Sequence, residues 1–163
     1  MDAATNIVHE FLNGGKLIVY TEGKARPKSS VYSTDKRAVC VDTKLALLID
    51  EFSASASEIV AGAIQDNDRG LIIGRRSFGK GLVQEQIPLS DGSALRLTVA
   101  RYYTPTGRCI QKPYSKGSEE YYMEYYHRYD DGELENADSI KLIDSLKYRT
   151  PGGKIVYGGG GIM

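Results

Sequence analysis

Residues 45–73 read LALLIDEFSASASEIVAGAIQDNDRGLII, and this segment determines the expected fold. The continuous apolar runs at residues 45–49 and 71–73 are typical of buried strands. Between them, apolar residues recur from Ala56 to Ile64 at the spacing of a helix with one core-facing side. A strand, a helix and a second strand in succession are typical of an α/β fold. We therefore expect a mostly parallel sheet with flanking helices.

The flanking segments add further elements to this unit. Apolar residues at helical spacing predict a helix over the first dozen positions. An Asp91-Gly92 pair between two strand-like runs predicts an added β-hairpin over residues 83–103. The other expected elements are a strand over residues 17–20, a surface loop over 22–35, a helix over 119–129 with a half-buried tyrosine surface, and a further helix over 138–148.

The composition fits one globular unit with small or polypeptide partners. The chain has 163 residues, 41% of them hydrophobic, which is enough for one core and too few to promise two domains. Its 21 basic and 21 acidic residues cancel, so no overall field favours nucleic acid or an anionic membrane. We expect Cys40 and Cys109 to be buried free thiols. No spacing of His and Cys residues indicates a metal site.

Residues 74–81, GRRSFGKG, nearly match the phosphate-binding pattern GxxxxGK[ST]. The match fails at Gly81, because a P-loop needs a hydroxyl group there to bind magnesium. It fails again further along, since residues 83–87 alternate like a strand where a helix N-terminus would have to lie beneath the phosphates. The segment therefore disfavours a nucleotide-binding function.

Ser55 allows two interpretations. Ser55 and Glu58 fit the SxxE capping box, so the serine can simply begin the helix that follows. A serine at the first turn of a helix, directly after a buried strand, also lies near unpaired backbone N–H groups and the positive end of the helix dipole. There it could act as a nucleophile, with the Ala56 amide donating to the developing oxyanion.

A nucleophilic serine needs a base, and neither His9 nor His127 lies in a recognisable setting. Lys80 is the remaining candidate. Its pKa would have to fall from about 10.4 to about 7, which corresponds to roughly 4–5 kcal/mol of destabilisation of the ammonium. Apolar neighbours at positions 78, 82 and 83 could supply the burial, and glycines at 79 and 81 could bring the lysine close to Ser55. Taken alone, however, a GKG sequence is typical of an exposed turn.

Several short motifs together resemble the catalytic core of the carboxy-terminal processing (tail-specific) proteases. They are residues 53–63 (SASASEIVAGA), 73–74 (IG), 78–81 (FGKG), Gln84 and 104–107 (TPTG). This resemblance covers about the first two-thirds of the chain. Residues 150–153 (TPGG) and the glycines at 158–161 are similar to one branch of the family.

The resemblance implies a serine endopeptidase that cleaves polypeptides near their C-terminal tails without a cofactor. It makes Ser55 the nucleophile, Lys80 the general base and Gln84 the residue that orients the lysine. Lys80 and Gln84 would lie about 13 Å apart on a straight strand, so we expect a bend between them. The resemblance also implies a crotonase/Clp-protease-like core and a location outside the cytoplasm, in the periplasm or cell envelope.

Both ends of the sequence indicate a fragment of a longer protein. We expect residues 1–113 to form a partial Ser/Lys protease core that lacks its N-terminal side, and residues 114–163 to be a Tyr- and Gly-rich extension of the same domain. The family's PDZ domain and its glycine-rich oxyanion element are absent, which predicts poor activity of the isolated fragment. The expected partners are polypeptide substrates, and the sequence is also compatible with a homo-oligomer. The alternatives are a non-catalytic peptide-binding or scaffolding module and an acyl-CoA-processing enzyme of crotonase-like fold.

Overall fold

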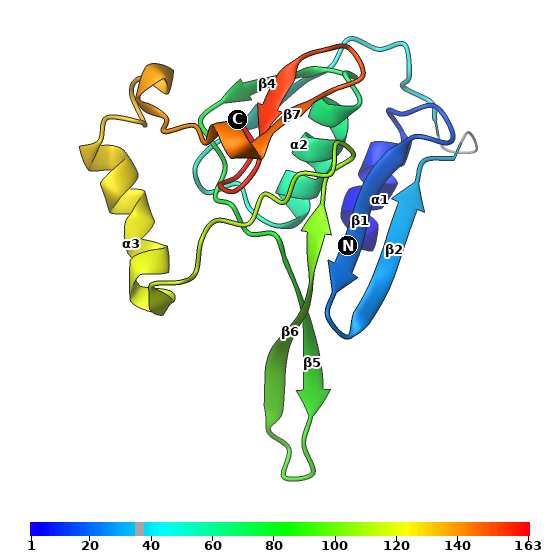
Figure 1. Cartoon of the computed structure of the whole chain (residues 1–163). Helices are drawn as coiled ribbons and strands as arrows, with labels where there is room; N and C mark the ends of the chain where they lie inside the picture. The colour runs from blue at the N-terminus through cyan, green and yellow to red at the C-terminus, as the bar shows by residue number, and fades with distance from the viewer. Residues whose placement is uncertain (35–37) are drawn as a thin grey trace.

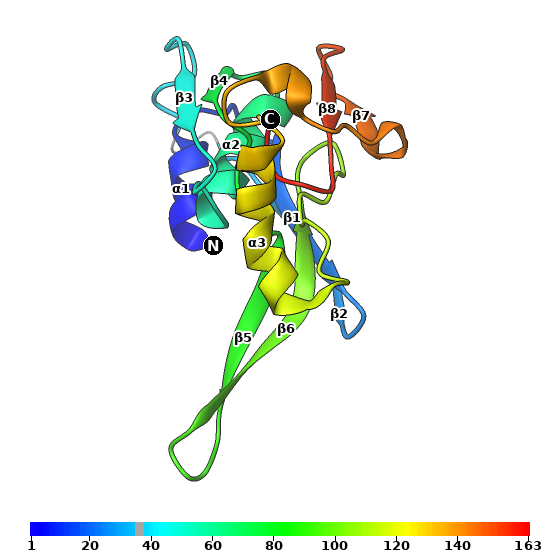
Figure 2. The ribbon, with the colours of Figure 1, turned by 90° about the vertical axis from the view of Figure 1, so that its left-hand side faces the viewer.

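The computed structural model describes residues 1–34 and 38–163, and Figures 1 and 2 show how the elements are arranged around helix α2. In chain order the elements are α1 (Asp2–His9), β1 (Leu17–Gly23), β2 (Arg26–Tyr32), β3 (Ala46–Ile49), α2 (Ala56–Asp66), β4 (Leu71–Gly74), β5 (Leu82–Pro88), β6 (Ala94–Tyr103), α3 (Gly117–Asp130), two 3-10 turns (Ala137–Ser139 and Asp144–Leu146), β7 (Lys147–Arg149) and β8 (Ile155–Tyr157).

The strand–helix–strand unit predicted from residues 45–73 is present. Strands β3 and β4 pair in parallel, from Ala46 opposite Leu71 to Ile49 opposite Gly74, and α2 connects them. The apolar spacing of α2 places Ile59 and Ile64 in the core, where they are at most 5% exposed. Ser55 therefore lies where β3 has ended and α2 begins.

The expectation of a mostly parallel sheet is wrong, although the mixed α/β class is confirmed. The largest sheet has the order β2-β1-β6-β5, and all of its pairs are antiparallel. The physical reason is the length of the connections: β1 and β2 are joined by two residues, and so short a link permits only antiparallel pairing. The parallel pair β3-β4 forms a separate, smaller sheet.

The predicted surface loop over residues 22–35 is also wrong, because residues 22–23 end strand β1 and residues 26–32 form strand β2. Residue 35 lies outside the described part of the chain. β2 lies at the edge of the antiparallel sheet, where Pro27 needs no hydrogen-bonding partner and several side chains remain exposed. An edge strand of this kind carries no apolar alternation. Its polar sequence therefore resembles that of a loop.

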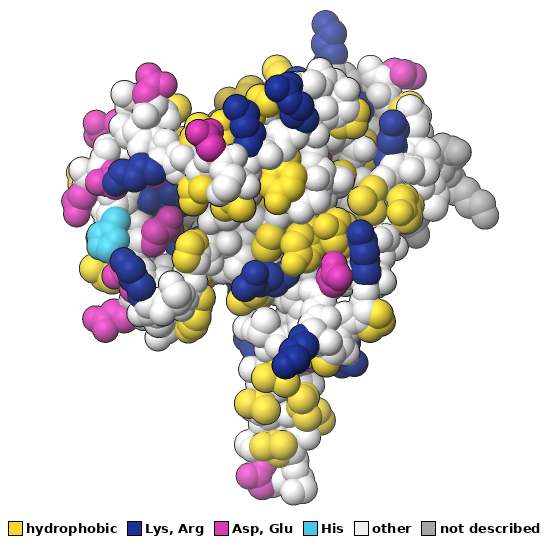
Figure 3. All heavy atoms as spheres, viewed as in Figure 1, with side chains coloured by type: hydrophobic (Ala, Val, Ile, Leu, Met, Phe, Trp, Pro, Cys, Tyr) yellow, Lys and Arg dark blue, Asp and Glu magenta, His cyan; other side chains and the backbone are white. Residues whose placement is uncertain are grey.

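The predicted hairpin is confirmed, and it projects from the body of the molecule as a long arm (Figures 1 and 2). A register shift between Val83 and Gln84 interrupts the β5–β6 pairing near the base of the arm. Exposed hydrophobic side chains run along the arm (Figure 3), and they include Ile87, Leu89, Leu95 and Leu97. The arm leaves the body directly after Lys80.

The C-terminal third packs beside this unit. The predicted tyrosine-rich helix is confirmed as α3, but Tyr121 is buried while Tyr122, Tyr126 and Tyr129 are exposed. The helix predicted over residues 138–148 is wrong. That stretch forms two 3-10 turns and the start of β7. At the first turn the Asn136 side chain accepts a hydrogen bond from the Asp138 N–H, a contact that competes with an α-helix.

The hydrophobic core lies where the N-terminal helix, α2 and the antiparallel sheet meet. α1, α2, β1 and the end of β6 enclose a common apolar cluster, into which Ile162 inserts with 0% exposure. Cys40 and Cys109 are free thiols, as predicted, but each is only partly buried. Within residues 1–34 and 38–163, no helix is long and apolar enough to cross a membrane, and no group of His, Cys, Asp and Glu could hold a metal ion.

Candidate active site

Ser55 lies at the N-cap of α2 in an unusual backbone conformation. Its φ is 55° and its ψ is −110°, a region that residues with a side chain rarely adopt. Such a conformation costs about 1–3 kcal/mol and persists only where the surrounding contacts enforce it. The predicted capping contact is present, since the Ser55 N–H donates to the Glu58 carboxylate at 2.8 Å. Ser55 therefore begins the helix, as the first interpretation required, and it does so in a strained geometry.

The Glu58 side chain is fully buried and does more than cap the helix. Its Oε2 accepts the N–H groups of Ser55 at 2.8 Å and Lys80 at 2.9 Å. Its Oε1 accepts the Ser77 hydroxyl and the Gly79 N–H, both at 2.6 Å. One carboxylate thus holds the backbone at Ser55 and the backbone at Lys80, residues that are 25 positions apart in the sequence.

Tyr102 provides a second connection between the same two residues. Its hydroxyl lies 3.1 Å from the backbone carbonyl of Ser55 and within hydrogen-bonding distance of that of Lys80, so its one hydrogen is shared between the two carbonyls. The side chain is 2% exposed. Burial, together with the negative charge of Glu58, raises the pKa of Tyr102 above its ordinary value, so the hydroxyl keeps its proton and remains a donor.

A cavity of about 210 Å³ opens beside these residues. It is lined by Met1, Ser55, Ala56, Ile59, Leu82, Val83, Gln84 and Tyr102. Ala56 is the first residue of α2, so its N–H has no acceptor within the helix and lies at the positive end of the dipole. The cavity therefore brings together the predicted nucleophile, the predicted oxyanion donor and Gln84.

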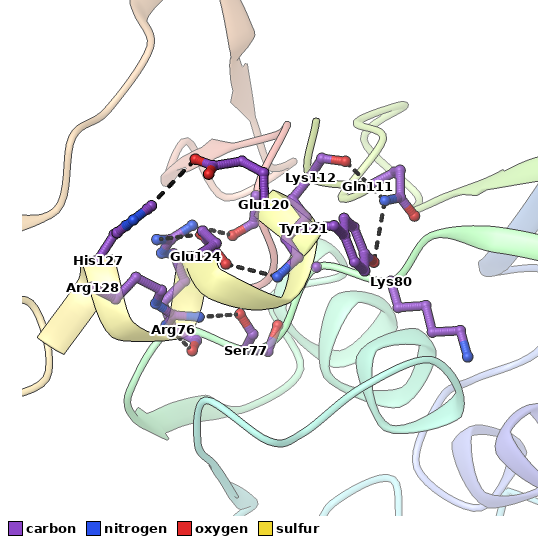
Figure 4. Close-up of polar contacts among 12 residues, drawn as sticks. Arg76, Ser77, Lys80, Gln111, Lys112, Glu120, Tyr121, Glu124, His127 and Arg128 are labelled. Carbon is purple, nitrogen blue, oxygen red and sulfur yellow. Dashed lines mark hydrogen bonds and ion pairs between the residues drawn. The ribbon is translucent and has the colours of Figure 1, made fainter. Parts of the chain in front are cut away.

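Lys80 is partly buried, and its side chain extends away from the charged cluster around Arg76 and Glu124 (Figure 4). The Gln84 amide donates to the Thr98 hydroxyl at 3.4 Å. The role of Gln84 in orienting the lysine stays a prediction. Because β5 begins at Leu82, a strand follows the GKG segment, and the phosphate-binding alternative lacks its helix.

Gly79 and Gly81, the glycines on either side of Lys80, lie in close contact with residues 111–112. A Cβ on Gly79, where φ is +87°, would lie 3.2 Å from the Lys112 Cβ, and one on Gly81 would lie 3.0 Å from the Gln111 nitrogen. Both glycines therefore allow residues 79–81 to pack closely against residues 111–112. Hydrogen bonds from the Lys112 N–H to the Gly79 carbonyl and from the Gly81 N–H to the Gln111 side chain fix this contact.

The two histidines have contacts of their own elsewhere. The Thr34 N–H donates to His9 Nδ1 at 3.3 Å, and His127 Nδ1 lies 3.6 Å from Glu120 on α3 (Figure 4). The TPTG motif has a structural role. The Thr106 hydroxyl and the Arg108 guanidinium bind Asp66 at the end of α2, and the Arg108–Asp66 pair is fully buried.

A cluster of charges joins α3 to the segment that precedes Lys80 (Figure 4). Arg76 binds Glu133 at 2.7 Å and Glu124 at 3.2 Å, Arg128 binds Glu133 at 2.8 Å, and Lys112 binds Glu124 at 2.8 Å. The Lys112 ammonium also lies 3.9 Å from the centre of the Phe78 ring. No motif in the sequence predicts this cluster, because its members come from distant segments.

Comparisons with known proteins agree on one family. The sequence model of peptidase family S41 matches residues 1–118. A carboxy-terminal-processing protease of Bartonella bacilliformis is 47% identical over 111 residues, which are 68% of this chain and 25% of that protein. A chloroplastic C-terminal processing peptidase of Tetradesmus obliquus is 42% identical over 110 residues, which are 68% of this chain and 23% of that protein.

The solved structures give the same result for the fold. A photosystem II D1 C-terminal processing protease superposes with a TM-score of 0.61 at 40% identity, over 68% of this chain and 28% of that one. The chain thus spans about a quarter of the length of the relatives that it matches.

Proposed function

The chain belongs to peptidase family S41, as its resemblance to the carboxy-terminal processing proteases predicted, and on this premise we propose that it carries a Ser/Lys catalytic dyad. Ser55 is the nucleophile and Lys80 is the general base. One observation carries the proposal: the buried Glu58 carboxylate binds the backbone N–H groups of both residues. A contact of this kind keeps the two residues in a fixed relation, as proton transfer between them requires.

The proposed reaction is acyl transfer without a cofactor. The neutral Lys80 amine takes the proton from the Ser55 hydroxyl, and the oxygen attacks a peptide carbonyl. The Ala56 N–H donates to the oxyanion at the start of α2, a contribution typically worth about 3–4 kcal/mol. The Lys80 ammonium then protonates the leaving amine. Water, deprotonated by the same lysine, releases the acyl group, while Gln84 orients the lysine amine through a neutral amide.

The proposed substrates are polypeptides cleaved near their C-terminal tails. The relatives are named for C-terminal processing. Ile59, Leu82 and Val83 give the cavity beside Ser55 an apolar wall, which suits an uncharged side chain next to the cleaved bond. The chloroplast named for one relative supports a location outside the cytoplasm. These substrates and this location belong to the proposal.

Product analysis tests the reaction class. An unstructured polypeptide and an acyl-CoA thioester are incubated separately with the chain, and the products are identified by mass spectrometry. We expect slow peptide cleavage, as predicted for the isolated fragment, that Ser55→Ala and Lys80→Ala each abolish. Lys116→Ala, at an exposed lysine at the N-cap of α3, should leave it unchanged. Thioester hydrolysis alone would indicate an acyl-CoA enzyme. Peptide binding with no product would indicate a binding module.

A further inference from the structure

Ser77 is a fully buried serine outside the proposed dyad, and both of its hydrogen-bonding functions are in use. Its hydroxyl donates to Glu58 Oε1 at 2.6 Å and accepts the Ile162 N–H at 2.7 Å. A hydroxyl has only one hydrogen. Because the Ile162 N–H occupies the oxygen of Ser77, that hydrogen is directed at Glu58.

The C-terminal segment, residues 158–162, is held beside Ser77 by several backbone hydrogen bonds. The Gly159 and Gly161 N–H groups donate to the carbonyls of Cys109 and Ile110, and the Ser77 N–H donates to the Ile162 carbonyl at 2.9 Å. Gly161 has a φ of +94°, and a Cβ there would lie 2.5 Å from the Ser77 carbonyl oxygen. Only glycine permits so close an approach.

Helix α3 contacts the same serine from another direction. Arg128 donates to the Ser77 carbonyl at 3.2 Å and also to the Arg76 carbonyl. The N–H, the carbonyl and the hydroxyl of Ser77 are therefore all bound by groups from the C-terminal third or by Glu58. Ser77 is the point where the C-terminal third meets the carboxylate that holds Ser55 and Lys80.

We propose that Ser77 is a positioning residue that couples the C-terminal segment, residues 158–162, to the Ser55–Lys80 dyad through Glu58. The effect of this coupling on catalysis rests on the proposed function, in which Ser55 and Lys80 carry out the reaction. Without the hydroxyl, the Gly79 N–H is the hydrogen-bond donor that remains to Glu58 Oε1 among the described residues. The carboxylate can then rotate, and the backbone at Ser55 and Lys80 loses its fixed relation. Because Ser77 does not line the cavity beside Ser55, its loss affects reaction more than binding.

The test compares Ser77→Ala with Ser33→Ala. Ser33 is a matched control, since it is 4% exposed and its hydroxyl likewise accepts one backbone N–H, from Lys16. Its hydrogen is directed at backbone carbonyls, with Asn13 as the nearer acceptor and Lys16 at 3.2 Å. The rate of Ser55 labelling, measured at increasing fluorophosphonate concentrations, gives the maximal labelling rate and the half-saturating concentration of the reagent separately. We expect Ser77→Ala to lower the maximal rate about tenfold or more with a half-saturating concentration within about twofold of the wild type, and Ser33→Ala to change neither.

Hydrogen exchange provides a readout that does not depend on activity. Ser77→Ala should speed exchange of the Ser55, Gly79 and Lys80 amides about tenfold, and Ser33→Ala should not. If Ser77→Ala fails to fold, Gly161→Ala tests the coupling from the C-terminal side and should have the same two effects. Equal behaviour of the Ser77 and Ser33 variants in both assays would overturn the coupling. A wild-type chain that is not labelled at Ser55 would overturn the proposed function instead, and exchange alone would then decide the coupling.

Discussion

Ser55 has to satisfy two requirements, one on its backbone and one on its side chain. The position needs a backbone with φ near 55°, which glycine adopts most readily, and the proposed reaction needs a side-chain hydroxyl there. Two contacts hold Ser55 in this backbone conformation: Glu58 binds its N–H, and Tyr102 binds its carbonyl. The strain at Ser55 is therefore linked to the same contacts that hold Lys80.

Two substitutions of Ser55 should distinguish the strain in its backbone from the role of its hydroxyl as nucleophile. Ser55→Gly and Ser55→Ala both remove the nucleophile, so neither should be labelled by a fluorophosphonate. Ser55→Gly should nevertheless be about 1–3 kcal/mol more stable to urea than Ser55→Ala, because glycine relieves the positive φ and is the better N-cap. Urea unfolding followed by circular dichroism measures the difference. An alanine variant as stable as the glycine variant would show that the position is unstrained.

Removal of the Tyr102 hydroxyl should lower both the stability of the fold and the reactivity of Ser55. Tyr102→Phe keeps the buried ring and loses the donor to the Ser55 and Lys80 carbonyls, so we expect a free energy of unfolding lower by about 1–2 kcal/mol and Ser55 labelling slower by about tenfold. Tyr20→Phe is a control, since Tyr20 stacks on Tyr103 and does not line the cavity beside Ser55. Labelling at the wild-type rate in Tyr102→Phe would contradict the positioning role.

At the scale of elements, α3 is held to the body by charge as well as by apolar contact. Glu133 follows the helix and binds both Arg76 and Arg128. Burial acts to raise the pKa of Glu133, but the hydrogen bond and positive charge of Arg76, with those of Arg128, lower it overall. The ionised carboxylate thus stabilises the position of α3 against residues 76–77.

This shift predicts how stability depends on pH. A carboxyl group with a lowered folded-state pKa contributes its full stabilisation above its ordinary pKa, 4.5 for Glu133, and loses it as the pH falls through the folded-state pKa. Glu133→Gln should therefore be less stable than the wild type at pH 7, and the difference should narrow below about pH 4. Urea midpoints between pH 7 and 3 test this, with the exposed Glu119→Gln as the control. A difference that is constant with pH would contradict the prediction.

At the scale of the whole molecule, the sequence predicted local elements better than their assembly. The period of α2 and the Asp91-Gly92 turn are local signals, and the structure confirms both elements. The edge strand β2 was missed because an exposed strand needs no apolar alternation. Glu58 was predicted as a cap only. Its contacts with Ser77, Gly79 and Lys80 arise from tertiary packing, which no spacing in the sequence encodes.

The measurement that tests the Ser55–Lys80 dyad most directly is the site and rate of fluorophosphonate labelling. Intact-mass analysis and peptide mapping of the labelled chain should show one adduct, on Ser55, and Lys80→Ala should slow its formation by about 100-fold or more because the general base is lost. Lys116→Ala, at a lysine whose side chain is 77% exposed, provides a control for the loss of a lysine and should leave the rate unchanged. An adduct on Ser53 or Ser57, or an unchanged rate in Lys80→Ala, would contradict the dyad.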